Sequence, residues 1–232
     1  GFRPPPRPAA TVDWEKTTEI IHVLNDQLGD DDHEVRAFVL RRMLREGVAA
    51  DLTRLAAWLR VESDGELMLE ILEALESHAV PKLLAATVAR QSAPEAGRRR
   101  ALDLLVEQAS SAVPRQLFEL AEQLEDGPVL GAVLRQLGSR SELDVQALLR
   151  EKLASREALV RAEAMRALGR RGSTAARGHL AGLLADESPE VRLAAAESTG
   201  LLGAQEVADS LLILAAGDDL PLVRSSLQSL RQ

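Results

Sequence analysis

Apolar residues recur along the chain at positions i, i+4, i+5 and i+8, which is the pattern of one buried helix face. The stripe returns seven times, at intervals of 30 to 32 residues. We call the residue that opens each stripe the anchor of its copy, and position +n lies n residues after it. The anchors are Val35, Leu67, Gly97, Val129, Val160, Val191 and Val223. A repeat of this length is typical of a stacked solenoid.

A second apolar stretch of about eleven residues, long enough for a helix, lies between consecutive stripes. Examples are residues 49–59, 113–124, 175–185 and 207–216. Each copy therefore predicts a pair of helices. Six of the ten prolines fall at the expected helix starts, where a missing N–H costs nothing. The short polar residues five positions before an anchor are expected to cap the coming helix, and glycines at +12 to end it in the left-handed conformation. These residues are Asp30, Ser92, Ser155, Asp186 and Asp218, and Gly47, Gly172 and Gly203.

Arginine stands at position +1 in five copies, as Arg36, Arg98, Arg161, Arg192 and Arg224. Regularly spaced arginines on one edge suit a nucleic-acid backbone. The alternative is a ladder in which each guanidinium reaches an acidic cap or a carbonyl in the adjoining repeat. We favour the ladder, because Asp and Arg recur together six residues apart in three copies and the chain as a whole is acidic.

Three segments carry an order of Val-Arg, Ala or Leu, and Gly, which Asp precedes in the first and third: DDHEVRAFVLRRMLREG, LVRAEAMRALGRRG and DESPEVRLAAAESTGLLG. In this order the chain resembles the HEAT-repeat family, an armadillo-type α-solenoid family, particularly its lyase-like branch, from about residue 13 to the end. The resemblance implies an all-α fold: a right-handed α/α superhelix of about seven helix pairs, with first helices outside and second helices lining a concave side. Gly97 and Leu130 depart from the pattern.

The chain of 232 residues carries a net charge of −8. An acidic chain is a poor general binder of nucleic acids or anionic membranes. No apolar run approaches the length of a membrane span. Residues 1–12 contain four prolines and predict a flexible tail or linker, and residues 13–232 predict the solenoid. In the last expected helix, polar residues are assigned to the outward face, as suits a capping repeat: Ser225, Ser226, Gln228 and Ser229.

The inventory of reactive groups is poor, since the chain has no Cys and no Tyr, and its four histidines occupy unrelated repeat positions. His33 and Glu34 form the one His-Glu pair, but the second His of a metalloprotease helix is missing at Ala37, so we interpret the pair as a solvated helix start. We therefore predict no catalytic residue, no cofactor and no metal site.

The strongest local anomaly is a run of six acidic residues without a basic one: Glu62, Asp64, Glu66, Glu70, Glu73 and Glu76. It is either a solvated face or an acidic patch that recruits a basic segment. If second helices line the groove, the side chains at positions +3 and +6 form its surface, and they differ in charge from copy to copy. The partner-binding residues predicted there are Phe38, Arg41, Glu66, Glu70, Glu73, Arg100, Arg135 and Arg166.

These observations favour a non-catalytic scaffold or adaptor that binds another protein, or a domain of its own parent chain, through the concave face. Two alternatives stay open: a lyase-like HEAT enzyme or chaperone handling a tetrapyrrole chromophore, and a DNA-binding solenoid. We expect no nucleic-acid partner and no direct membrane insertion. Absence of cysteine favours the cytoplasm, either as a separate protein or as the soluble domain of a larger or membrane-attached one. The oligomeric state stays open.

Overall fold

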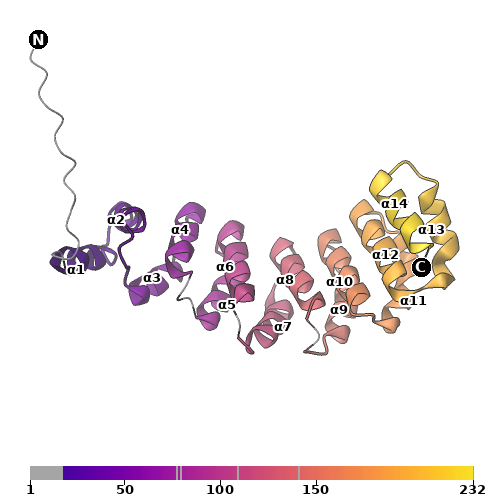
Figure 1. Ribbon diagram of the computed structural model, residues 1–232, viewed down its shortest axis with the longest axis horizontal. Coiled ribbons are helices and arrows are strands. Elements are labelled where there is room, and N and C mark those ends of the chain that lie inside the picture. Colours follow the sequence, from indigo (N-terminus) through magenta and orange to yellow (C-terminus); the bar gives the residue numbers. More distant parts are fainter. Residues whose placement is uncertain (1–17, 77, 79, 109, 141, 232) are drawn as a thin grey trace, which may run out of the picture. The chain divides into compact units, whose positions relative to one another are not determined.

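The computed structural model describes residues 18–76, 78, 80–108, 110–140 and 142–231 (Figure 1). The predicted tail, residues 1–12, lies outside the described residues. Over the described ranges the chain forms fourteen α-helices and short 3-10 turns, and no strand. The helices form two compact units, residues 18–62 with 66–78 and residues 63–65 with 80–231.

The first unit contains four helices, of which α4 begins one residue outside it. They are α1 (Thr18–Gln27), α2 (His33–Glu46), α3 (Leu52–Leu59) and α4 (Gly65–Leu75). Each even-numbered helix carries a repeat anchor near its start, and each odd-numbered helix precedes it, so that α1 to α4 form two of the predicted pairs. The core of this unit includes Leu40, Met43, Leu55, Leu59 and Ile71, which are almost completely buried.

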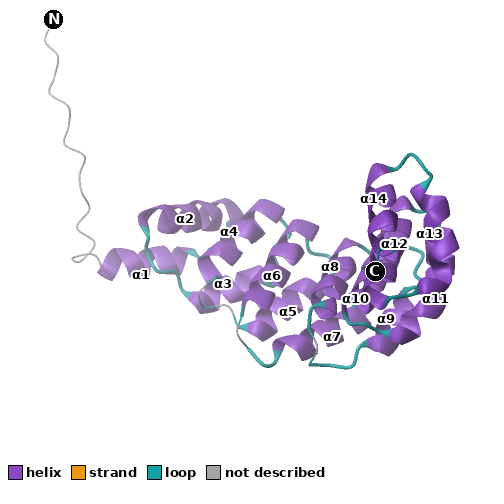
Figure 2. Ribbon diagram, turned by 45° about the vertical axis from the view of Figure 1, so that its right-hand side comes forward, coloured by secondary structure: helices purple, strands orange, loops and turns teal. Residues whose placement is uncertain are grey.

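The second unit contains ten helices, drawn in magenta to yellow in Figure 1. They are α5 (Pro81–Ala89), α6 (Glu95–Glu107), α7 (Val113–Gln123), α8 (Pro128–Gly138), α9 (Gln146–Lys152), α10 (Ala158–Arg170), α11 (Arg177–Leu184), α12 (Pro189–Leu202), α13 (Ala208–Ala215) and α14 (Leu220–Ser229). The even-numbered helices pack on one another in chain order, α6 on α8, α8 on α10, α10 on α12 and α12 on α14, while α5 packs on α7 and α11 on α13 (Figure 2). This two-layer stack confirms the predicted all-α solenoid of helix pairs.

The repeat period explains the core of the second unit. Its anchors Val129, Val160 and Val191 are buried, and so are the residues at +4, of which Ala164 and Ala195 are fully buried. These small side chains let neighbouring even-numbered helices approach closely. The hydroxyl oxygen of Ser198 on α12 lies 3.1 Å from the carbonyl oxygen of Met165 on α10, across that contact, and 2.7 Å from that of Ala194 on its own helix, so its one proton is shared between two acceptors.

The helix ends confirm the glycine prediction and correct the capping prediction. Gly47, Gly172 and Gly203 have φ of 66°, 63° and 57°, in the left-handed region where a Cβ is strained. The residues five positions before an anchor do not cap the helix itself. Asp30, for example, accepts a hydrogen bond from the backbone N–H of Asp32 at 2.8 Å, and Asp32 then caps α2. A short turn therefore separates this aspartate from the residue that caps the helix, two positions later. The same turn precedes α12, where the carboxylate of Asp186 accepts a hydrogen bond from the backbone N–H of Ser188 at 2.8 Å.

The polar outward face predicted for the last helix is wrong for Ser226 and Ser229, whereas Gln228 is exposed as predicted. Ser226 on α14 is fully buried, and the hydroxyl of Ser229 donates to the carbonyl oxygen of Ala196 on α12 at 2.6 Å. These two serines thus lie on the inner side of α14, and Ser229 contacts α12 as Ser198 contacts α10. The exposed side of α14 carries Leu220 and Leu227 instead, at 77% and 47% exposure.

Candidate partner-binding surface

In the first unit, five predicted residues lie on the exposed side of two helices, which we call the α2–α4 surface: Phe38, Arg41, Glu66, Glu70 and Glu73. Arg41 joins α2 to α4, since its Nε lies 2.9 Å and 3.0 Å from the two carboxylate oxygens of Glu70. Phe38 lies one helical turn before Arg41, and Glu66 and Glu73 lie one turn either side of Glu70. The ion pair therefore places the five positions on one side of the helix pair.

The α2–α4 surface combines a large apolar side chain with carboxylates. The Phe38 side chain is 63% exposed, which is unusual for a phenyl ring. Glu66 and Glu73 are exposed, and Glu70 is half-buried against Arg41. One of the three glutamates is thus partly neutralised within the unit, and the other two remain directed to solvent.

Glu62, the first member of the acidic run, does not belong to this surface. Its carboxylate is buried, with an exposure of 4%, and Oε2 accepts a hydrogen bond from Nε1 of Trp58 at 2.7 Å. The Nε2 of His33 lies 3.2 Å from the same oxygen. Arg36 lies over the Trp58 ring, 5.1 Å from its centroid. The structure confirms that His33 starts a helix but adds an internal partner, and the i, i+4 spacing of Trp58 and Glu62 was the sequence signal for this contact.

In the second unit, the predicted arginines lie on the corresponding helices α6, α8 and α10. Arg135 on α8 and Arg166 on α10 share one carboxylate oxygen of Glu163, at 2.8 Å and 3.2 Å. Glu163 is 2% exposed. Arg166 also reaches Glu197 on α12 at 3.0 Å. The Nη1 of Arg100 lies 4.0 Å from Glu107 on its own helix. The structure thus brings Arg135 and Arg166 into one network, which runs from α8 to α12, and leaves Arg100 outside it.

The network changes the proton affinity of its arginines. The hydrogen bond to Glu163 raises the pKa of Arg135 above its usual value, against the effect of partial burial. Burial lowers the pKa of Arg170, one turn after Arg166. Both residues stay charged at neutral pH, so this part of the surface carries fixed positive charge beside a buried carboxylate.

One contact recurs in both units. A +6 arginine of one copy pairs with the +3 glutamate of the next, as Arg41 with Glu70 in the first unit and Arg135 with Glu163 in the second. The charge pattern alone does not relate these four positions, but they form cross-copy pairs on the surface of the even-numbered helices. The charges of these four side chains are therefore partly neutralised by ion pairs within the protein.

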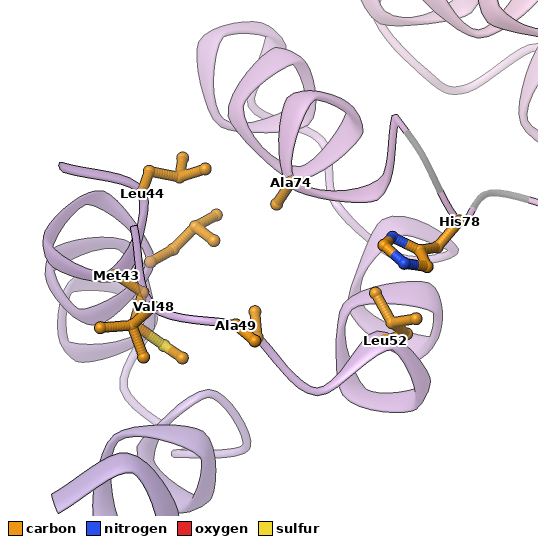
Figure 3. Close-up of a pocket in the computed structure, with 9 residues that line it drawn as sticks. Met43, Leu44, Val48, Ala49, Leu52, Ala74 and His78 are labelled. Atoms are coloured by element: carbon orange, nitrogen blue, oxygen red, sulfur yellow. The ribbon is translucent and has the colours of Figure 1, made fainter. Parts of the chain in front are cut away.

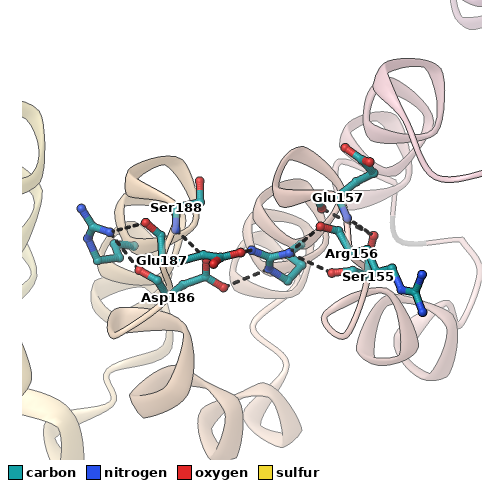
Figure 4. Close-up of polar contacts among 8 residues, drawn as sticks. Ser155, Arg156, Glu157, Asp186, Glu187 and Ser188 are labelled. Atoms are coloured by element: carbon teal, nitrogen blue, oxygen red, sulfur yellow. Dashed lines mark hydrogen bonds and ion pairs between the residues drawn. The ribbon is translucent and has the colours of Figure 1, made fainter.

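The ladder predicted for the arginines at +1 is present at Arg161, whereas Arg36, Arg98 and Arg192 donate to carbonyl oxygens of their own copies (Figure 4). Arg161 on α10 reaches the Asp186 carboxylate of the next copy through Nε at 2.9 Å and Nη2 at 2.8 Å. Its Nη1 donates to the carbonyls of Ser155 and Arg156, and that of Arg192 to the carbonyls of Asp186 and Glu187. The carbonyl acceptors thus belong to the arginine's own copy, not to the adjoining one. Arg161 is 11% exposed and is held within the fold, unlike a residue that follows a phosphate backbone.

A pocket of about 200 Å³ lies within the first unit, between α2, the loop after it, α3 and α4 (Figure 3). Its lining is aliphatic apart from the imidazole of His78, and includes Leu44, Ala49, Leu52 and Ala74. It lacks the aromatic walls that the tetrapyrrole alternative requires.

Across the described ranges, no cluster of three or more His, Asp or Glu side chains is arranged to hold a metal ion. In the same part of the chain, none of the helices combines the length and apolar character needed to cross a bilayer.

Comparison with known proteins yields one family. Residues 147–231 match the family model of HEAT repeats, and this range covers α9 to α14. A search of curated proteins gives no match to the chain. HEAT repeats are generally non-catalytic modules for protein interaction. Residues 147–231 are therefore similar to HEAT repeats, and helix pairs also form the rest of the described chain.

Proposed function

We propose that the protein is a scaffold that binds a partner protein, or a domain of its parent chain, through the exposed side of its even-numbered helices. The observation that carries this proposal is the α2–α4 surface, where a phenyl ring exposed to 63% lies beside the exposed carboxylates of Glu66 and Glu73. Exposed aromatic residues are enriched among the residues that dominate binding energy, whereas an acidic rim mainly sets orientation and association rate.

The chemistry of this surface defines the partner. Phe38 fits an apolar depression on the partner, where its ring leaves water on binding. Glu66 and Glu73 fit a segment that carries Lys or Arg, and Glu70 contributes less because Arg41 already pairs with it. The partner class is therefore a protein with a basic segment beside an apolar depression.

The arginines of the second unit are proposed to contribute weaker polar contacts to the same partner or to another one. Arg135 is the most accessible of the pair that shares Glu163, and its guanidinium keeps donors beyond the one that binds this carboxylate. Arg100 and Arg166 add to the same face. Carbonyl or carboxylate oxygens are the matching groups on a partner.

The test is affinity capture of proteins from the native extract, with four forms of the full chain as baits, followed by identification of the captured proteins. The forms are the wild type, Phe38→Ala, a triple variant with Glu66, Glu70 and Glu73 changed to Lys, and a control triple variant. The control reverses three exposed glutamates on the odd-numbered side, Glu122, Glu151 and Glu206. Both triple variants change the net charge equally.

A partner bound at the α2–α4 surface is retained by the wild type and the control and lost by the other two forms. With the purified partner, we expect Phe38→Ala to weaken Kd by about 30-fold, the effect of losing about 2 kcal/mol at an aromatic hot spot. The Glu-to-Lys triple variant should lower the association rate about tenfold or more, with a reduced salt dependence. Equal capture by all four forms, with helicity intact by circular dichroism, would contradict the proposal.

A further inference from the structure

The end of the helix stack in the second unit presents an apolar hollow that the proposed function does not use. It lies along the exposed side of α14, and we call it the α14 surface: Leu220, Val223, Arg224, Leu227, Gln228 and Arg231. Its three apolar residues are spaced i, i+3 and i+7, so that they form one stripe along the helix. This spacing is the one by which two helices pack side by side.

Two of these positions, the anchor and +4, are buried in the preceding copies of the second unit. The anchor Val191 and its +4 residue Ala195 are completely buried, whereas their equivalents in the last copy, Val223 and Leu227, are half-buried and 47% exposed. The +4 residue is also larger in the last copy, Leu in place of Ala. The α14 surface thus exposes two positions that the preceding copies cover, and adds Leu220 where the three copies before it carry Asp126, Glu157 and Ser188.

The neighbouring helix α13 shows the same change. Leu212 and Ile213 are exposed there, and the residues 31 positions earlier, on the exposed part of α11, are Ala181 and Gly182. Large apolar side chains therefore replace small ones in both helices of the last pair. Exposed apolar residues gathered on adjacent helices indicate an interaction site.

The charges along α14 identify a second copy of this chain as the occupant. The N-terminal end of the helix carries Asp218 and Asp219, and the C-terminal end carries Arg231. All three residues are exposed. Asp218 and Arg231 are equally far along the chain from the point between Arg224 and Ser225, which is the middle of α14. If a two-fold axis passes through this point at a right angle to the helix, the two copies of α14 run antiparallel. Asp218 of each copy then lies beside Arg231 of the other copy.

We propose that the protein self-associates through the α14 surface, with two copies of α14 packed antiparallel about a two-fold axis. The stripe of Leu220, Val223 and Leu227 then covers its own copy, and the ends are joined by two equivalent Asp218–Arg231 pairs. A two-fold interface requires one patch that is complementary to itself, which this combination of a central apolar stripe and opposite charges at the two ends provides. The antiparallel arrangement also places the helix dipoles favourably.

The experiment is sedimentation velocity of the full chain from about 1 µM to about 500 µM, because an interface centred on one ten-residue helix belongs to the small, weak class. We expect the wild type to shift from monomer to dimer over this range. Leu227→Asp should remain monomeric, and Leu201→Asp, an exposed position on α12, should dimerise like the wild type.

A charge-swap series separates this geometry from any other association. Asp218→Arg and Arg231→Asp should each weaken dimerisation about tenfold, because each leaves two like-charged contacts across the axis. The variant with both changes restores two opposite-charge pairs and should return to within about threefold of the wild type. A wild type that stays monomeric throughout, a dimer that persists in Leu227→Asp, or a double variant without recovery would overturn the proposal.

Discussion

Two contacts between even-numbered helices, one in each unit, show opposite solutions to the same packing problem. In the second unit, α8, α10 and α12 meet through glycine, alanine and serine, and no space is left for another atom. A Cβ added at Gly138 of α8 would lie 2.7 Å from the Cα of Ala167 on α10, and one at Gly169 of α10 would lie 2.6 Å from the Ser198 hydroxyl on α12. The first contact is with backbone, which has no rotamer to change.

In the first unit, α2 and α4 are separated by the pocket lined by Leu40, Met43, Leu44 and Ala74, and an ion pair at the surface joins them (Figure 3). The residues of α2 that line this pocket, Leu40, Met43 and Leu44, are larger than the glycines and alanines at the α8–α10 contact. One repeat pattern therefore accommodates both tight and loose contacts, since the period fixes which positions face a neighbour and side-chain size fixes how near that neighbour lies.

The largest effect is expected where the contact is tightest. Gly138→Ala places a methyl group against the Ala167 backbone, so α8 and α10 must separate. We expect the free energy of unfolding to fall by about 2 kcal/mol, the overpacking cost after the better helix propensity of Ala is subtracted. Urea titration followed by circular dichroism measures it.

The matched control is Gly182→Ala on α11, where nothing lies within 4 Å of the added Cβ. Helix propensity acts alone there, and we expect a gain of about 0.5 to 1 kcal/mol. If both variants gained stability, the close approach of α8 and α10 would be absent in solution.

The next effect concerns the ladder that accompanies the tight contacts. Arg161→Ala leaves Asp186 and two loop carbonyls without their donor, in a region where both side chains are only 11% exposed. We expect a loss of about 2 kcal/mol. Arg115→Ala, which removes a largely exposed pair with Glu119, should cost less than about 0.5 kcal/mol. Hydrogen exchange should show the loss at the starts of α10 and α12, and an equal effect of the two variants would contradict the ladder.

The same pair makes stability depend on pH. Burial raises the pKa of Asp186, but the hydrogen bonds from Arg161 and from the Ser188 N–H outweigh it, and the pKa lies below its usual 3.8. A carboxylate with a lowered folded-state pKa contributes stability that is present above the unfolded value and lost as pH falls through the folded value. We expect stability to decline below about pH 4 and Asp186→Asn to remove part of that decline. Urea midpoints for both forms across the acid range measure it, and parallel curves would refute the assignment.

The sequence predicts the features that depend on local periodicity, but not those that depend on contacts with neighbouring helices and loops. The pairing of helices and the left-handed glycines follow from residues close together in the chain, and they were confirmed. The capping residue was placed two positions early, because Asp30 and Asp186 each make a turn before the helix that the spacing alone does not distinguish from a cap.

The predicted site shows the same limit. The exposure of Phe38 agrees with its assignment to a surface, but Glu62 was grouped with the exposed glutamates because the pattern of charges does not reveal the buried Trp58 beside it. The pattern assigns the serines of α14 to the outward face because a capping repeat is expected to end in a polar surface. The contact with α12 decides which side of α14 faces inward. Ser229 lies on that side, as Ser198 does where α12 contacts α10.

The smallest effect is expected at the loose contact between α2 and α4. Ala74→Leu extends a side chain from α4 into the pocket of about 200 Å³, where it can cover Leu40 and Leu44 without displacing backbone. Filling such a space is expected to stabilise the first unit by about 1 kcal/mol. Ala57→Leu, at an exposed position on α3, controls for the change in residue type and should leave stability unchanged. Thermal unfolding of both variants decides the point. A loss of stability in Ala74→Leu alone would mean that the α2–α4 contact is already as close-packed as that between α8 and α10, and that size at these positions does not set the spacing.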